Sequence, residues 1–167
     1  MAATSDWRPE DATAKRIANH KEQALTEANP ITGGCLCGGV RFTYSGELGG
    51  SLGLVTLCHC GQCRKVTGFA VAVVPARMAG FAITQGRDLV REYESSPGKF
   101  RAFCGVCGGP IYSRRASLPE ALRLRLGVLD NPPADLKIQA HIFTEGAPAW
   151  ANTDDAPRYP GEEPGRP

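Results

Sequence analysis

Short runs of β-branched and aromatic residues, separated by glycines and polar turns, follow one another from Ile31 onward. Runs of this kind at hairpin spacing are typical of β-strands. Five of them are Val40–Tyr44, Leu52–Leu57, Phe69–Val74, Phe81–Thr84 and Leu89–Tyr93. We therefore predict a body made mainly of antiparallel β-strands.

Two later segments alternate apolar and polar residues. In Leu122–Leu126 the leucines fall on one face of an extended strand, whereas Arg123 and Arg125 fall on the other. This pattern is typical of a half-buried antiparallel strand, so we expect both arginines on its outer face. Leu136–Phe143 alternates in a similar way and is predicted to form another strand.

Helical signals are few and short. A polar, alanine-rich stretch at Asp11–Asn19 predicts a short N-terminal helix. Farther along, only Gly61–Thr67 and a single turn at Leu118–Ala121 favour helix. The expected organisation is an N-terminal appendage at 1–30, one β domain at 31–150 and a proline-rich, poorly ordered tail at 151–167.

Composition and charge narrow the class of partner. The chain has 167 residues and a formal net charge of +2, which suits one compact domain without the dense basic run that nucleic-acid binding requires. No window approaches 18 consecutive apolar residues, so we expect no membrane partner. Residues 1–30 carry scattered charges and no apolar stretch, which makes a cytoplasmic location the expectation.

Cysteine is the most informative residue type in this chain. The seven cysteines form three clusters, which are Cys35 and Cys37; Cys58, Cys60 and Cys63; and Cys104 and Cys107. An odd count in a cytoplasmic chain disfavours disulfides. Residues i and i+2 of an extended segment point to one face, and a glycine-flanked C-x-x-C turns two thiolates toward one point. The spacing therefore predicts zinc binding.

The number of ligands divides the cysteines between two zinc ions. A closed tetrahedral site needs four ligands, which the two doublets supply together, whereas the triplet leaves one position open. We predict a structural zinc on Cys35, Cys37, Cys104 and Cys107, and a catalytic zinc on Cys58, Cys60 and Cys63. The open position suits a substrate thiolate or a carbonyl oxygen.

Three other interpretations of the cysteines stay open. All seven could be buried apolar residues, or Cys60 and Cys63 could form a redox pair, although no βαβ pattern surrounds them. The second zinc could also be purely structural, with His59, His141 or another side chain as its fourth ligand. His59 lies between two ligands in an extended segment, so its side chain should point away from the metal.

Three linked motifs resemble one known family. They are Gly33–Phe42, with Cys-Leu-Cys-Gly-Gly; Cys58–Gly68, with Cys-His-Cys-Gly-Gln-Cys; and Phe103–Tyr112, with Cys-Gly-Val-Cys-Gly-Gly. In order, spacing and flanking glycines the chain resembles the glutathione-dependent formaldehyde-activating enzymes, a family that includes centromere protein V-like proteins. The resemblance implies a β-tent fold, the same division of cysteines and a lyase activity that forms S-hydroxymethylglutathione from formaldehyde and glutathione.

The function expected on these grounds is that of a zinc-dependent carbon–sulfur lyase with two Zn²⁺ per chain and a small thiol or thiol adduct, such as glutathione, as substrate. The sequence does not single out a general acid or base. The available side chains are His59, His141, Tyr112, Asp130 and Glu145, and Arg64 and Lys65 follow Cys63 where they could meet a substrate carboxylate. The alternative is a non-enzymatic zinc-binding scaffold.

Overall fold

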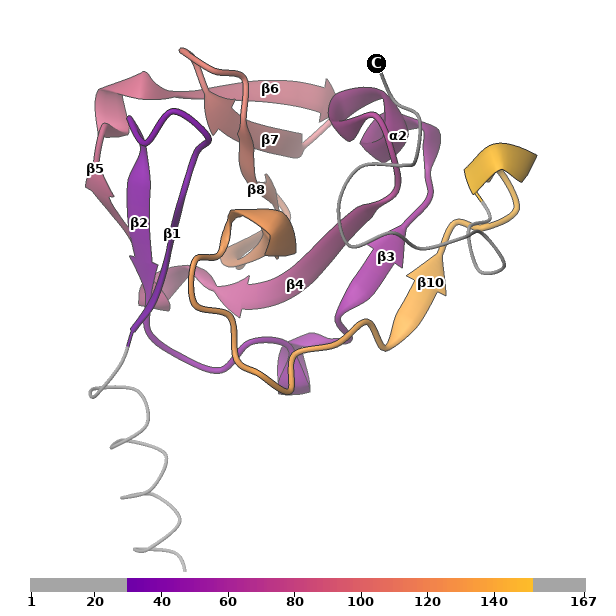
Figure 1. Cartoon of the computed structure of the whole chain (residues 1–167), viewed down its shortest axis with the longest axis horizontal. Coiled ribbons are helices and arrows are strands. Elements are labelled where there is room, and N and C mark those ends of the chain that lie inside the picture. The colour runs from indigo at the N-terminus through magenta and orange to yellow at the C-terminus, as the bar shows by residue number, and fades with distance from the viewer. Residues whose placement is uncertain (1–29, 152–167) are drawn as a thin grey trace, which may run out of the picture.

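A computed structural model describes residues 30–151 of the chain (Figure 1). The strands are β1 (Ile31–Gly34), β2 (Arg41–Tyr44), β3 (Thr56–Cys58), β4 (Val71–Arg77), β5 (Phe81–Gln85), β6 (Val90–Ser96), β7 (Lys99–Cys104), β8 (Pro110–Arg115), β9 (Leu118–Arg125) and β10 (Ala140–Ile142). The described α-helix is α2 (Gly61–Thr67). Short 3₁₀ turns lie at Gly50–Leu52, Met78–Gly80, Arg87–Leu89, Leu126–Val128 and Ala149–Ala151. The helix predicted at Asp11–Asn19 and the proline-rich tail lie outside the described residues.

The strands form two sheets. The smaller has the order β1-β2-β5, and the larger has the order β10-β3-β4-β9-β8-β7-β6. Figure 1 shows the small sheet at one side of the molecule and β3, β10 and α2 at the other. The prediction of a mainly β body is confirmed, with one correction: β10 runs parallel to β3, so the large sheet is mixed rather than wholly antiparallel.

The hydrophobic core lies between the two sheets. Phe42 and Tyr44 of β2 are 1% exposed, and they pack in the same cluster as Leu122 and Leu124 of β9. Cys104, at the end of β7, belongs to this cluster and is fully buried. The core therefore reaches one of the cysteine pairs directly.

Helix α2 has a clear local cause at each end. Cys60 is its N-cap in extended backbone, and its Sγ accepts a hydrogen bond from the backbone N–H of Cys63 at 3.4 Å. Gly68 ends the helix in the left-handed region at φ 79°, where a residue without Cβ is favoured. The prediction of a short helix at Gly61–Thr67 is thus confirmed.

Several predicted boundaries are wrong. Leu118–Ala121 forms the exposed start of β9 instead of a helical turn, because Leu118 pairs with Arg115 across the β8–β9 hairpin. Of the predicted run Leu52–Leu57, only Thr56 and Leu57 lie in a strand, β3, which extends one residue farther to Cys58. Of Leu136–Phe143, only Ala140–Ile142 forms a strand.

The arginine pair of β9 is a further correction, because its two members lie in different environments. Arg123 is exposed as expected, but Arg125 is only 4% exposed. The large sheet therefore buries a positive charge where alternation predicted solvent.

Within residues 30–151 the chain forms no helix that is both long and apolar enough to cross a membrane.

Candidate metal centres

The first cysteine cluster joins two turns that are far apart in sequence. Cys35 and Cys37 lie between β1 and β2, whereas Cys104 ends β7 and Cys107 lies in the turn before β8. The four Sγ atoms lie within 4.8 Å of one another. The Cys35–Cys37 and Cys37–Cys104 sulfur pairs are 3.5 and 3.9 Å apart. The two doublets of the sequence therefore meet in space.

Glycines shape both turns. Gly38 and Gly108 have φ values of 73° and 72°, a conformation that side chains with a Cβ rarely adopt. The backbone N–H of Val40 donates to the Sγ of Cys35 at 3.2 Å, which fixes that sulfur against its own turn. The flanking glycines of the motifs thus set the directions of the sulfurs.

The four sulfurs fit a tetrahedral zinc site. With Zn–S bonds of about 2.3 Å, tetrahedral ligands lie about 3.8 Å apart, a spacing that the two sulfur pairs bracket. Backbone N–H groups of Cys37 and Gly109 lower the pKa of Cys107 to about 6. The pKa of Cys37 is raised to about 11, because the neighbouring thiols of Cys35 and Cys107 outweigh a hydrogen bond from the Gly39 backbone. Four thiolates this close repel one another, and a bound cation would remove that repulsion.

The second cluster is formed where β3 passes into α2. Cys58 ends β3, Cys60 caps α2, and Cys63 lies in the first turn of that helix. Their three Sγ atoms also lie within 4.8 Å of one another. Cys58 and Cys63 are each 6% exposed, so this cluster is more deeply buried than the first, where Cys37 is exposed. This cluster has three members, and no histidine or carboxylate of residues 30–151 adds a fourth potential ligand.

The thiols of this second cluster differ in acidity. Burial raises the pKa of Cys58 to about 12, and the neighbouring thiols add to the effect. Burial also acts on Cys60, but hydrogen bonds from the Cys63 backbone and the neighbouring thiols prevail and lower its pKa. Sulfur ligands favour soft metal ions such as zinc, so this cluster suits the same ion as the first. Each cysteine must lose its proton to bind that ion.

The two histidines predicted as candidates lie together. The Nε2 of His59 and the Nδ1 of His141 are 3.0 Å apart, with the rings stacked at 19°. The parallel pairing of β10 with β3 places His141 opposite Leu57 and so brings it to His59. His59 is 8% exposed, and its Nδ1 has no hydrogen-bond partner among the described residues. Neither ring belongs to the three-cysteine cluster, in agreement with the expectation that His59 points away from it.

Two buried arginines lie beside the second cluster. Arg101 of β7 donates from Nη1 to the Sγ of Cys63 at 3.7 Å, from Nη2 to Gln62 at 3.0 Å and from Nε to Ser95 at 2.9 Å. Burial lowers the pKa of Arg125, while the thiolates of the second cluster oppose that effect. Arg101 was not among the residues predicted from the sequence. The sequence offers one sign of its role, which is that a positive residue interrupts the apolar run before Cys104.

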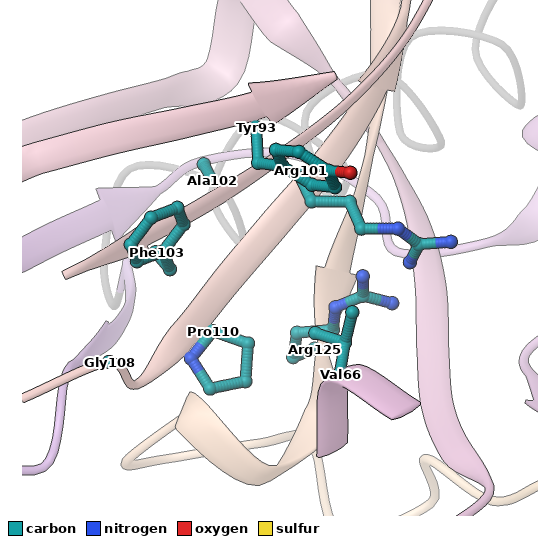
Figure 2. Close-up of a pocket in the computed structure, with 8 residues that line it drawn as sticks. All are labelled: Val66, Tyr93, Arg101, Ala102, Phe103, Gly108, Pro110 and Arg125. Atoms are coloured by element: carbon teal, nitrogen blue, oxygen red, sulfur yellow. The ribbon is translucent and has the colours of Figure 1, made fainter. Parts of the chain in front are cut away.

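A cavity of about 350 Å³ adjoins these arginines (Figure 2). Its lining includes Arg101 and Arg125, then Val66 of α2, and Phe103 and Pro110 toward the other end. Gly108, the residue that follows Cys107 in sequence, lines it as well. The structure therefore combines three clustered thiols, buried positive charge and open space.

The remaining candidates from the sequence are engaged elsewhere or lie at the surface. Asp130 pairs with Arg41, and the Tyr112 hydroxyl donates to Glu92 at 3.3 Å. Arg64 donates to the carbonyl of Gly146 at 3.3 Å. Lys65 and Glu145 are exposed. None of these five side chains makes a hydrogen bond or ion pair with the second cluster among the described residues.

Comparison with known proteins supports this picture. The sequence model of a family described as glutathione-dependent formaldehyde-activating enzyme matches residues 30–146. A crystal structure of a Rhodobacter sphaeroides protein is similar, with a TM-score of 0.51 and 26% identity, and the match covers 66% of this chain and 98% of that chain. No curated protein sequence matches the chain.

Proposed function

The chain belongs to the family of glutathione-dependent formaldehyde-activating enzymes, and from this membership we propose that it is a zinc-dependent carbon–sulfur lyase acting on a small thiol and an aldehyde. In the synthetic direction the thiol sulfur bonds to the carbonyl carbon. The carbonyl oxygen becomes a hydroxyl and takes the proton that the thiol gives up, so no further reactant is required. Glutathione and formaldehyde are the first substrates to test, and cleavage of the adduct is the reverse step.

The observation that carries this proposal is the incomplete ligand set of the second cluster. Cys58, Cys60 and Cys63 converge without a fourth cysteine, histidine or carboxylate from the described residues. Zinc held by these residues would supply an open, Lewis-acidic position for a substrate sulfur or carbonyl oxygen. The first cluster has four cysteines and would leave no such position, so we assign it the structural role.

The residues around the second cluster are arranged to hold this ligand set in place. The β3 strand fixes Cys58, and the N-terminus of α2 fixes Cys60 and Cys63 by a backbone hydrogen bond. Arg101 donates to the Sγ of Cys63, which withdraws negative charge from that sulfur. Gln62 and Ser95 accept from the same guanidinium and orient it.

The histidine pair is the candidate for moving the proton of the reaction. His59 is buried between two cysteines of the cluster, and His141 is exposed. Their nitrogens lie at hydrogen-bond distance, so the pair connects a buried ring with one that is exposed to solvent. This arrangement lets the chain hold or pass one proton between Nε2 of His59 and Nδ1 of His141.

The test is exchange NMR spectroscopy of formaldehyde and glutathione with the zinc-loaded protein. We expect the adduct to form and break down faster with the protein than in buffer. Cys60→Ser should lose that acceleration, and its circular dichroism spectrum should be unchanged. A cobalt-substituted sample should change its visible spectrum when the thiol is added. If the metal-loaded protein shows neither acceleration nor a spectral response to any small thiol, it is a zinc-binding scaffold and the proposal is wrong.

A further inference from the structure

The cavity beside the second cluster has two chemically different ends. Figure 2 shows the guanidinium groups of Arg101 and Arg125 gathered at one end, with Phe103 and Pro110 at the other. Val66, from α2, adds an apolar wall near the arginines. Such a cavity, mostly apolar with a few charged groups at one end, is the usual form of a site for a small organic molecule.

Arg125 is buried and has no hydrogen-bond or ion-pair partner in the part of the chain that the structure describes. Its residue is 4% exposed, its Nε has no hydrogen-bond partner, and its side chain donates no hydrogen bond to any described residue. The ion pairs found among residues 30–151 join Arg41 to Asp130 and Arg114 to Glu92, so no carboxylate within that range pairs with Arg125. Burial of an uncompensated charge is costly, and proteins retain it where a ligand or another charge compensates it.

Arg101 differs from Arg125 in this respect. All three of its nitrogens donate, to Ser95, Gln62 and the Sγ of Cys63. Three thiolates around one Zn²⁺ carry a net charge of about −1, which one guanidinium balances. The second guanidinium, on Arg125, is therefore in excess of what the cluster itself requires.

The face of the sheet around these residues reinforces the positive charge. Lys99 and Arg101 lie two residues apart on β7, and Arg123 and Arg125 lie two residues apart on β9. The register places Arg101 and Arg123 on either side of Ser113, in one row across the sheet. Burial, followed by the charges of Arg115, Arg101, Arg123 and Arg125, lowers the pKa of Lys99 to about 8. An anion bound in this region would offset the repulsion among these positive charges.

We propose that this cavity binds the carboxylate of a small organic acid, with the oxyanion on Arg125 and the apolar part of the molecule against Phe103, Pro110 and Val66. A planar guanidinium with unused N–H groups matches a carboxylate in geometry and charge. The consequence of this binding rests on the proposed function. If the chain is a lyase, its thiol substrate carries a carboxylate, and this site holds the carboxylate end of the substrate beside the second cluster.

Binding is tested without any chemistry at the metal. Isothermal titration of the zinc-loaded protein compares 3-phenylpropionate with its neutral amide, and inorganic phosphate forms a third arm. The carboxylate should bind, and the amide should bind about tenfold to a hundredfold more weakly because a charge-assisted hydrogen bond is lost. Equal affinity for carboxylate and amide overturns the proposal. Tighter binding of phosphate than of the organic acid also overturns it, since the site would then be one for inorganic oxyanions.

Variants locate the site. Arg125→Met should weaken 3-phenylpropionate binding by about tenfold to a hundredfold. Arg123→Met removes the same charge from an exposed position two residues earlier on the same strand and should change binding less than about twofold. Arg125→Lys keeps the charge and should bind with intermediate affinity, which tests the site even if the methionine variant fails to fold. Unchanged binding in Arg125→Lys and Arg125→Met, or an equal loss in Arg123→Met, contradicts the assignment.

A pair of thiols separates this inference from the lyase proposal. In the exchange assay, 3-mercaptopropionate should react faster than the neutral 2-mercaptoethanol, and Arg125→Met should abolish that preference. If neither thiol reacts but 3-phenylpropionate still binds at Arg125, the lyase proposal falls and the carboxylate site stands. If both thiols react equally well and Arg125→Met changes nothing, the lyase proposal stands and the carboxylate site falls.

Discussion

The two cysteine clusters of this protein are built from the same side chain but differ in their surroundings. The first, Cys35 with Cys37, Cys104 and Cys107, is surrounded by glycine turns and backbone N–H groups, and the tips of its turns, Leu36 and Val106, are 91% and 68% exposed. The second is buried beside charged and titratable side chains and a cavity. Under the proposed function, ligand number and neighbourhood, and not cysteine itself, would separate the structural centre from the reactive one.

The largest expected effect is on the first cluster. Cys104→Ser removes a ligand that is also fully buried in the core. Loss of a structural zinc forfeits apparent folding free energy on the order of 10 kcal/mol, which is as large as the whole stability of a typical domain. We expect no cooperative unfolding transition by circular dichroism and little zinc by metal analysis. A folded variant that binds one zinc would show that this cluster is not the anchor.

The matched change in the second cluster should leave the fold intact. Cys60→Ser removes one of three ligands at the N-cap of α2, where serine is itself a favourable cap. Metal analysis should show a fall from two zinc ions per chain to about one, with the strand signal preserved and the lyase activity lost. Loss of both metals would mean that the two clusters do not bind independently, and the contrast between them would fail.

The histidine pair supplies a third, smaller test. His141→Ala removes the partner of Nε2 of the buried His59, whose Nδ1 already lacks one. An unsatisfied buried polar group costs about 1–3 kcal/mol, so the urea midpoint should fall accordingly. Glu145→Ala, four residues farther along at an exposed position, is the control and should leave the midpoint unchanged. An unchanged midpoint in His141→Ala would show that the contact between the two histidines does not stabilise the fold.

The smallest expected effect concerns an ion pair remote from the second cluster. Arg114 lowers the pKa of Glu92 below its ordinary value of 4.5, so the pair stabilises the fold above that value and loses its effect as the pH falls through the folded-state pKa. Glu92→Gln should reduce stability at pH 7 by less than about 1 kcal/mol. The difference from wild type should vanish in acid, as measured by thermal unfolding at several pH values. A pH-independent difference would contradict this assignment.

Local sequence patterns predicted those parts of the fold whose cause is local. Gly61–Thr67 was recognisable as a helix because its cap and its terminating glycine are neighbours in sequence. The strands β7 and β8 were missed. Lys99–Cys104 interleaves basic and apolar residues, and Pro110–Arg115 begins with a proline and ends with two arginines, so both become strands through their partners in the sheet. The same reason explains Arg125, whose burial depends on what packs over the strand and not on alternation along it.

For the candidate site, spacing predicted which cysteines would gather. Both groups, the four and the three, form as expected. The residues that distinguish the second group, Arg101 and Arg125, come from β7 and β9, far from Cys63 in sequence. No short-range pattern marks them, since only the register of β7, β8 and β9 brings them to one face. The grouping of the cysteines was therefore predictable, and the environment of each group was not.

The most direct test of the contrast between the clusters is anomalous diffraction at the zinc absorption edge, from crystals of the full chain grown with and without 3-mercaptopropionate. We expect two zinc peaks. One should be bound by Cys35, Cys37, Cys104 and Cys107 and unchanged by the thiol; the other should be bound by Cys58, Cys60 and Cys63, with a fourth ligand that becomes the added sulfur. A single zinc peak, or a second zinc closed by a protein side chain in both crystals, would contradict it.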